Sequence, residues 1–166
     1  ERAASYFREA LVFDPGYLPG LVQLGRVYSH MGKLEESINA YSKALELDPK
    51  DPLSHNNLGI LYGRIGSLEQ ARDEFTAAIE ADPEFADSYF NLGIVFENGG
   101  QADLALSALQ HALELDPQNG KYHSGLGAHY YSSGELLLAQ HHFELAKNLG
   151  AVLPPEVEDT IRELTE

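Results

Sequence analysis

Four Asp-Pro pairs recur along this chain of 166 residues at a constant spacing of 34. The pairs are Asp14-Pro15, Asp48-Pro49, Asp82-Pro83 and Asp116-Pro117. A constant period between about 20 and 50 residues indicates one supersecondary unit that is stacked on copies of itself. Such a chain buries its core between neighbouring units, so its function is expected to depend on surface rather than on catalysis.

The residues between the Asp-Pro pairs predict two helices in each unit. From residue 52 onward, Leu58-Gly59 and Tyr62 give one apolar set, and Ala71, Phe75 and Ala78 give a second. The Leu-Gly pair recurs at Leu24-Gly25, Leu92-Gly93 and Leu126-Gly127. Apolar residues at i, i+3, i+4 and i+7 share one face of a helix, so we expect a pair of amphipathic helices.

Glycines, acids and prolines mark the expected helix ends. A Gly inside a helix costs about 1 kcal/mol relative to Ala, so the recurrent Leu-Gly pair predicts a close approach of the two helices. A second recurrent Gly follows the first helix, where a left-handed C-cap favours it, and the second helix begins with acids that suit the helix dipole. These residues are Gly32, Gly66, Gly100 and Gly134, and Glu35, Glu36, Glu69 and Asp103. The proline then ends the second helix.

In these motifs the chain strongly resembles the tetratricopeptide repeat (TPR) family, whose 34-residue helix-turn-helix has a W-x2-L-G-x2-Y…A-x3-F…P pattern. The resemblance implies an all-α fold, a right-handed superhelical solenoid of antiparallel helix pairs. A single solenoid over residues 1–166 is expected, with an N-terminal half repeat, four full repeats and a C-terminal capping helix. The boundaries are 1–17, 18–51, 52–85, 86–119, 120–153 and 154–166. In the last segment Val157, Ile161 and Leu164 share one helical face.

Composition limits the partners. With 26 acidic and 11 basic residues the net charge is −15, which argues against nucleic acid and anionic lipid. No apolar run approaches the roughly 20 residues that span a bilayer, so membrane insertion is not expected. The chain has no Cys, and its compartment stays open, with the cytoplasm preferred over the periplasm. The chain begins in mid-repeat at Glu1, which indicates a portion of something longer.

The resemblance places a ligand on the concave face, which the first helices line. Positions 2–14 of the four repeats carry only Arg26, Arg64, Lys121, Asp87 and Glu97, so this groove sums to +1 and the rest of the chain to −16. The acidic convex face is interpreted as a solvated surface, with a docking site for a basic partner as the alternative.

Helix periodicity points a set of first-helix side chains away from the second helices and toward this groove. The expected groove residues are Val22, Gln23, Arg26, His30, Asn56, Asn57, Ile60, Arg64, Phe90, Asn91, Ile94, Asn98, Lys121, Ser124 and Tyr131, and Asp87 and Ala128 lie at equivalent positions. The apolar members are expected to be free of the core and open to a ligand. Asn57 and Asn91 occupy the same position in successive repeats, so their amides could bind the backbone of an extended peptide, or simply reflect a common TPR residue.

The carboxylate clamp of chaperone-binding TPR domains is poorly matched. Its five positions fall here on Val22, Arg26, Asn57, Asp87 and Asn91, with one match, or one repeat later on Asn56, Ile60, Asn91, Lys121 and Gly125, with two. A chaperone tail is therefore not the expected ligand, since Asp87 would repel a terminal carboxylate.

The histidines give no catalytic or metal signal. The chain has seven, of which His141 and His142 are adjacent and point in different directions, while His55 and His123 stand where the family has an inward Trp. Packed or surface imidazoles are expected rather than metal ligands, because no helix shows the zinc-site pairing at i, i+4. Adjacent His123 and Ser124 do not face each other, so no nucleophile–base pair is found. No cofactor is expected.

These observations predict a non-catalytic scaffold that holds a peptide or helical segment of a partner protein in its concave groove. One alternative is the substrate-recruiting arm of a larger enzyme, such as a protein glycosyltransferase with TPRs. Another is a self-assembling module that stacks through its incomplete N-terminal half repeat, where Phe7 and Leu11 are expected to be partly exposed.

Overall fold

A computed structural model describes residues 2–153, 155 and 157–159, and these residues form helices and connecting turns without strands. Their contacts divide the chain into two compact units, residues 1–85 and 86–166, and each unit is described by itself. The division falls between the second and third predicted repeats, so each unit contains two whole 34-residue intervals. The repeat boundaries themselves stay a prediction of the sequence pattern.

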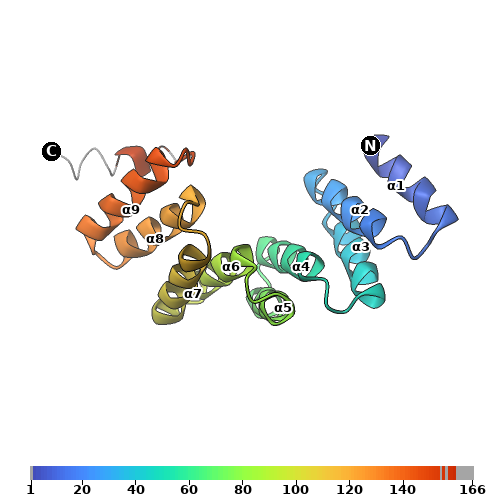
Figure 1. Cartoon of the computed structure of the whole chain (residues 1–166), viewed down its shortest axis with the longest axis horizontal. Coiled ribbons are helices and arrows are strands. Elements are labelled where there is room, and N and C mark those ends of the chain that lie inside the picture. Colours follow the sequence, from blue (N-terminus) through green and yellow to red (C-terminus); the bar gives the residue numbers. More distant parts are fainter. Residues whose placement is uncertain (1, 154, 156, 160–166) are drawn as a thin grey trace. The chain divides into compact units, whose positions relative to one another are not determined.

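Unit 1 contains five helices along its described residues 2–85. They are α1 (Arg2–Phe13), α2 (Leu18–His30), α3 (Leu34–Leu47), α4 (Pro52–Arg64) and α5 (Leu68–Ala81). Helices α2 and α3 form one close pair, and α4 and α5 form another (Figure 1). Helix α1 packs on α2, and α4 packs on both α3 and α2. This unit therefore shows the expected succession of helix pairs with one additional second helix, α1, at its start.

Unit 2 repeats this arrangement with α6 (Ala86–Asn98) paired to α7 (Ala102–Leu115), and α8 (Gly120–Ser132) paired to α9 (Leu136–Asn148). Helix α8 packs on α7 and also on α6. Residues 155 and 157–159 are helical, and Val157 packs against a cluster that contains Phe143 and Leu153. The rest of the predicted capping helix, including Ile161 and Leu164, lies outside the described residues.

The recurrent glycines have the predicted roles. A Cβ on Gly25 would lie 2.8 Å from Cζ of Tyr41, so only Gly lets α2 lie this close to α3. At the other glycine, Gly32 has a φ of 72°, the left-handed conformation predicted for the C-cap, and its counterparts in the other repeats share it. Tyr41 is 1% exposed beside this contact.

The Asp of each Asp-Pro pair has a role that the pattern did not predict. The Asp48 Oδ1 atom accepts a hydrogen bond of 3.0 Å from the Lys50 backbone N–H, and Asp82 accepts the same bond from Glu84. Asp14 and Asp116 do likewise. A carboxylate that accepts from the N–H two residues later closes an Asx-turn, so Asp shapes the turn that Pro begins.

Helix α1 is less buried than its counterparts. Phe7 occupies the position of Tyr41, Phe75 and Phe143, each of which is nearly fully buried, but Phe7 is only half-buried, as is Leu11. On the same helix Phe13 is 91% exposed. The predicted partial exposure of Phe7 and Leu11 is thus confirmed within unit 1.

Candidate functional site

In unit 1 the expected groove residues of α2 and α4 differ widely in exposure. Arg26, His30, Ile60 and Arg64 are exposed, Gln23 and Asn57 are half-buried, and Val22 and Asn56 are buried. The expectation that Val22 is free of the core is wrong, because it lies in the cluster that contains Leu21, Tyr41 and Leu58.

Polar contacts fix several of these side chains. The Arg64 guanidinium donates to Ser29 Oγ at 3.1 Å, which joins α4 to α2. Arg26 donates to Gln23 on its own helix. The Asn57 amide donates one hydrogen to the Leu53 carbonyl at 2.8 Å.

In unit 2 the predicted residues of α6 and α8 surround a hollow of about 550 Å³. Its lining includes Phe90, Ile94, Lys121, Ser124 and Ala128, all of which the sequence placed on this face. The opposite wall comes from the segment after α9. The residues there are Leu149, Gly150, Ala151 and Val152.

Phe90 forms the floor of this hollow rather than a free anchor. It is 9% exposed and belongs to the cluster with Leu109 and Leu126, so the expectation that it is not needed for the core is wrong. Its ring stacks on Tyr122 with 5.3 Å between centroids. A Cβ on Gly125 would lie 2.5 Å from Cε2 of Phe90, so this glycine makes the space that Phe90 fills.

An ion pair closes one side of the hollow. Lys121 Nζ lies 2.7 Å from Asp87 Oδ1 and 4.5 Å from the Phe90 ring centroid, a cation–π distance. The Tyr122 hydroxyl donates to the same Asp87 oxygen at 3.2 Å. Burial, and then the Asp87 carboxylate, raise the pKa of the Tyr122 phenol, so it stays a neutral donor. The pair leaves this rim without net charge.

The remaining predicted residues lie nearby on the same helices. Ile94 and Tyr131 are 37% and 48% exposed and could meet a ligand. Asn98 is exposed and Asn91 is half-buried. Asn57 belongs to unit 1 and Asn91 to unit 2, and each lies on a first helix of its own unit.

A histidine pairs with an acid between the two first helices of unit 2. His129 Nδ1 on α8 bonds Glu97 Oε1 on α6, and His129 is 5% exposed. Neither residue belongs to the predicted site. The sequence carries one signal of this pair. A histidine lies near the C-terminal end of the first helix α8, and a Glu lies near the C-terminal end of the preceding first helix, α6.

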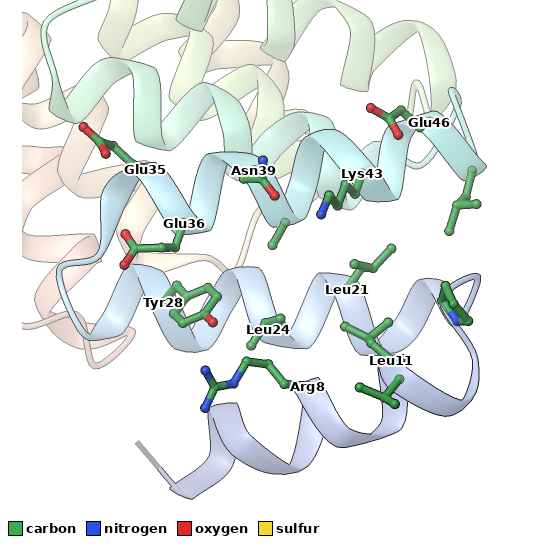
Figure 2. Close-up of a pocket in the computed structure, with 14 residues that line it drawn as sticks. Arg8, Leu11, Leu21, Leu24, Tyr28, Glu35, Glu36, Asn39, Lys43 and Glu46 are labelled. Atoms are coloured by element: carbon green, nitrogen blue, oxygen red, sulfur yellow. The ribbon is translucent and has the colours of Figure 1, made fainter.

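The structure also shows a hollow that the sequence did not suggest. It measures about 720 Å³ and lies in unit 1, between α1 and α3 and over α2 (Figure 2). It uses none of the predicted groove residues. Leu21 and Leu24 of α2 face it, with Arg8 and Leu11 of α1 on one side.

Three negative observations apply to the described residues. No cluster of three or more His, Asp or Glu side chains there could hold a metal ion. None of the described helices is long and apolar enough to cross a membrane. The His123 Nδ1 atom lies against His142 and not against the adjacent Ser124.

Comparison with solved structures shows the fold. The chain is similar to residues 41–end of MamA from Desulfovibrio magneticus RS-1, with 26% identity, a TM-score of 0.78 and coverage of 90% of this chain and 84% of that one. The chain is also similar to YrrB, described as a TPR protein with an unusual peptide-binding site, with 24% identity, a TM-score of 0.75 and coverage of 97% of this chain and 82% of that one. PilW, a type IV pilus biogenesis factor, has 22% identity, a TM-score of 0.85 and coverage of 97% of this chain and 74% of that one.

Family models give the same result at the sequence level, whereas no protein with a curated function matches the chain. A model described as Tetratricopeptide repeat matches residues 56–120 and 90–147, which is more than half of the chain. A second model, described as TPR repeat, matches residues 25–66. The chain belongs to the tetratricopeptide repeat family.

Proposed function

We propose that this protein is a non-catalytic interaction scaffold that binds a peptide segment of a partner protein against its first helices. The observation that carries the proposal is the hollow between α6, α8 and the segment 149–152, where five predicted groove residues line one concave surface. Concave sites with a mostly apolar lining and a few polar groups are the usual sites of ligand recognition.

The lining defines the chemistry of the segment. Phe90, Ile94 and Ala128 offer an apolar surface to one side chain of the peptide, while Ser124 offers a hydroxyl to its backbone. Because Lys121 is paired with Asp87, the rim attracts neither charge strongly. An extended peptide with an apolar anchor and flanking polar residues fits this surface, and its binding should depend little on salt.

A protein partner is also favoured over nucleic acid, because the net charge of −15 opposes a polyanion. In unit 1 we propose that Asn57 and Ile60 offer a contact surface of their own. The Asn57 side chain is half-buried and the Ile60 side chain is 37% exposed. Both can therefore contact a ligand without a change in the packing of the helices. YrrB offers an analogy for a TPR protein that binds peptide, at the level of fold.

The test is selection of peptides from a phage-displayed library of random dodecapeptides on the purified protein, followed by affinity measurement in solution. Ser124→Trp places an indole in the hollow and should weaken a selected peptide by about tenfold or more. Ser107→Trp is the matched control, since Ser107 is exposed on α7 outside this hollow. Equal affinities in both variants, or a library that yields no peptide, would contradict the proposal.

A further inference from the structure

The hollow between α1 and α3 of unit 1 is an apolar groove that contains none of the predicted groove residues of α2. Leu11 and Val12 contribute from α1, Leu21 and Leu24 from α2, and Leu47 from α3. Figure 2 shows Leu11, Leu21 and Leu24 between α1 and α3. Leu21 and Leu24 are each 6% exposed, so the floor is fixed by the core of unit 1. The groove therefore has a floor of buried side chains and a volume of about 720 Å³.

One end of this groove is basic. A second hollow of about 550 Å³ adjoins it there and shares Arg8, Tyr28 and Glu36 with it. Its lining adds Arg2 and Lys33. Three cations (Arg2, Arg8 and Lys33) and two carboxylates (Glu35 and Glu36) thus leave a charge of +1 at this end, although the chain as a whole carries −15.

These three cations have no counter-ion in the part of the chain that the structure describes. The ion pairs there involve other residues, such as Arg72 with Asp73 and Lys121 with Asp87. Lys33 Nζ lies 6.0 Å from the centroid of the Tyr28 ring, and Tyr28 lines both hollows. Arg2, Arg8 and Lys33 are all exposed, so they can pair with an incoming anion at little cost in desolvation.

The other end of the groove has no excess of cations. Glu46 and Leu47 lie at the end of α3, next to the end of α1 at Val12, and Lys43 lies three residues before Glu46, so one cation balances one carboxylate there. Asn39 stands between the two ends on α3. The groove therefore has a direction: a basic end, an apolar middle and an end without net charge.

We propose that this groove binds an amphipathic segment of a partner protein that carries a carboxylate at one end. Its apolar side chains would contact Leu11, Leu21 and Leu24, and its carboxylate would meet Arg2, Arg8 and Lys33. The charge of +1 at the basic end matches one carboxylate. A second copy of this chain is a poorer occupant, because two molecules with a net charge of −15 repel each other. This surface is separate from the proposed peptide site and extends the function beyond it.

The probe is a set of three fluorescent amphipathic Leu/Ala peptides that differ only at the C-terminal end, which carries two Glu, two Gln or two Lys. Fluorescence anisotropy with the purified protein should show the Glu peptide binding at least about fivefold tighter than the Gln peptide. The Lys peptide should bind most weakly. Equal affinities for the three peptides, or no binding of any, would overturn the proposal.

Charge reversal locates the contact. The double variant Arg8→Glu with Lys33→Glu should reverse the order, so that the Lys peptide binds more tightly than the Glu peptide. Lys50→Glu with Lys147→Glu gives the same change in net charge outside both hollows and should leave the order unchanged. Because Arg8 and Lys33 are exposed and make no ion pair among the described residues, the variant should keep the wild-type circular dichroism.

Light scattering tests the other possible occupant of the groove, a second copy of this chain. If the protein alone forms dimers that the Arg8→Glu and Lys33→Glu variant abolishes, the groove binds a second copy and the proposal is wrong. A protein that stays monomeric in both forms, together with the reversed peptide order, supports it. The test leaves the first-helix site untouched, so failure here and failure of the proposed function are distinguishable.

Discussion

The Nδ1 atoms of His123 and His142 lie 3.0 Å apart, so one imidazole must donate to the other between α8 and α9. The ring of Tyr130 stacks on His142 at 5.5 Å, and His123 is 7% exposed. Glu114 of α7 lines the same small hollow as His142. Two adjacent imidazoles can share this contact only while at least one of them is neutral.

This contact predicts a pH-dependent stability. Burial, then the neighbouring His123 and His141, lower the pKa of His142 to about 4 from an ordinary value of about 6.5. Above pH ~6.5 both states are neutral and the group has no effect. As the pH falls from about 6.5 toward 4, the unfolded chain binds a proton that the folded chain resists, so stability is lost over this range. Urea denaturation by circular dichroism at several pH values measures it.

His142→Gln should flatten the wild-type loss of stability between these pH values. His30→Gln is the control, because His30 is exposed on α2, outside the His123–His142 contact, and its substitution should leave the slope near that of the wild type. If both variants give the wild-type slope, the His123–His142 contact does not control the titration.

Replacement of Gly by Ala should change stability in opposite directions at two helical positions. In Gly127→Ala the new Cβ would lie 2.5 Å from Cδ1 of Phe143, so the helices must separate and stability should fall by about 1–3 kcal/mol. In Gly63→Ala the Cβ meets nothing within 4 Å, and the helical α4 backbone should gain up to about 1 kcal/mol. Thermal and urea unfolding of the two variants decide between these signs. Similar effects at both sites would mean that Gly127 is not a packing glycine.

Replacement of two buried serines by Ala should also change stability by different amounts. Ser37 Oγ donates to the Gly25 carbonyl at 2.7 Å, whereas Ser54 Oγ has no partner among the described residues, and both side chains are fully buried. Ser37→Ala should cost about 1 kcal/mol, because the Gly25 carbonyl keeps only its helical partner. Ser54→Ala should be neutral or stabilising, since an unsatisfied buried hydroxyl is removed. Denaturant midpoints that fall equally for both would refute this distinction.

Truncation of Leu58 tests the core of unit 1. Leu58 is 2% exposed within the cluster that contains Leu21 and Tyr41, so Leu58→Ala should cost roughly 2–5 kcal/mol. Leu137→Ala removes the same atoms at a position that is 84% exposed and should change stability by less than about 0.5 kcal/mol. A loss below about 1 kcal/mol at Leu58 would contradict the packing described.

The helices and turn glycines could be predicted because they depend on local chemistry within one repeat. Gly32 adopts its left-handed conformation for a reason that its neighbours along the chain supply. Phe90 and Val22 point away from the second helix of their own repeat, so a pattern confined to one repeat does not show that both are buried. Phe90 instead packs against Tyr122 and Gly125 of the following first helix.

The two hollows could be anticipated only in part. The α6 and α8 lining followed from helix periodicity, but the wall from 149–152 depends on how the chain turns after α9. The α1–α3 groove depends on the sizes of side chains from three helices at once, such as Leu11, Leu24 and Lys43. No spacing in the sequence expresses that combination. Whether either surface binds a partner stays a prediction.

Because Gly125 leaves the space that the Phe90 ring fills, the order of these repeats could not be changed freely. Phe90 is the fifth residue of the predicted repeat 86–119, and Gly125 is the sixth residue of the predicted repeat 120–153. The corresponding residue in the repeat 52–85 is Asn57, whose amide would occupy the space that the phenyl ring needs. The two repeats are thus matched as a specific pair. A shuffled array would have to keep 86–119 directly ahead of 120–153, and these modules are not interchangeable building blocks.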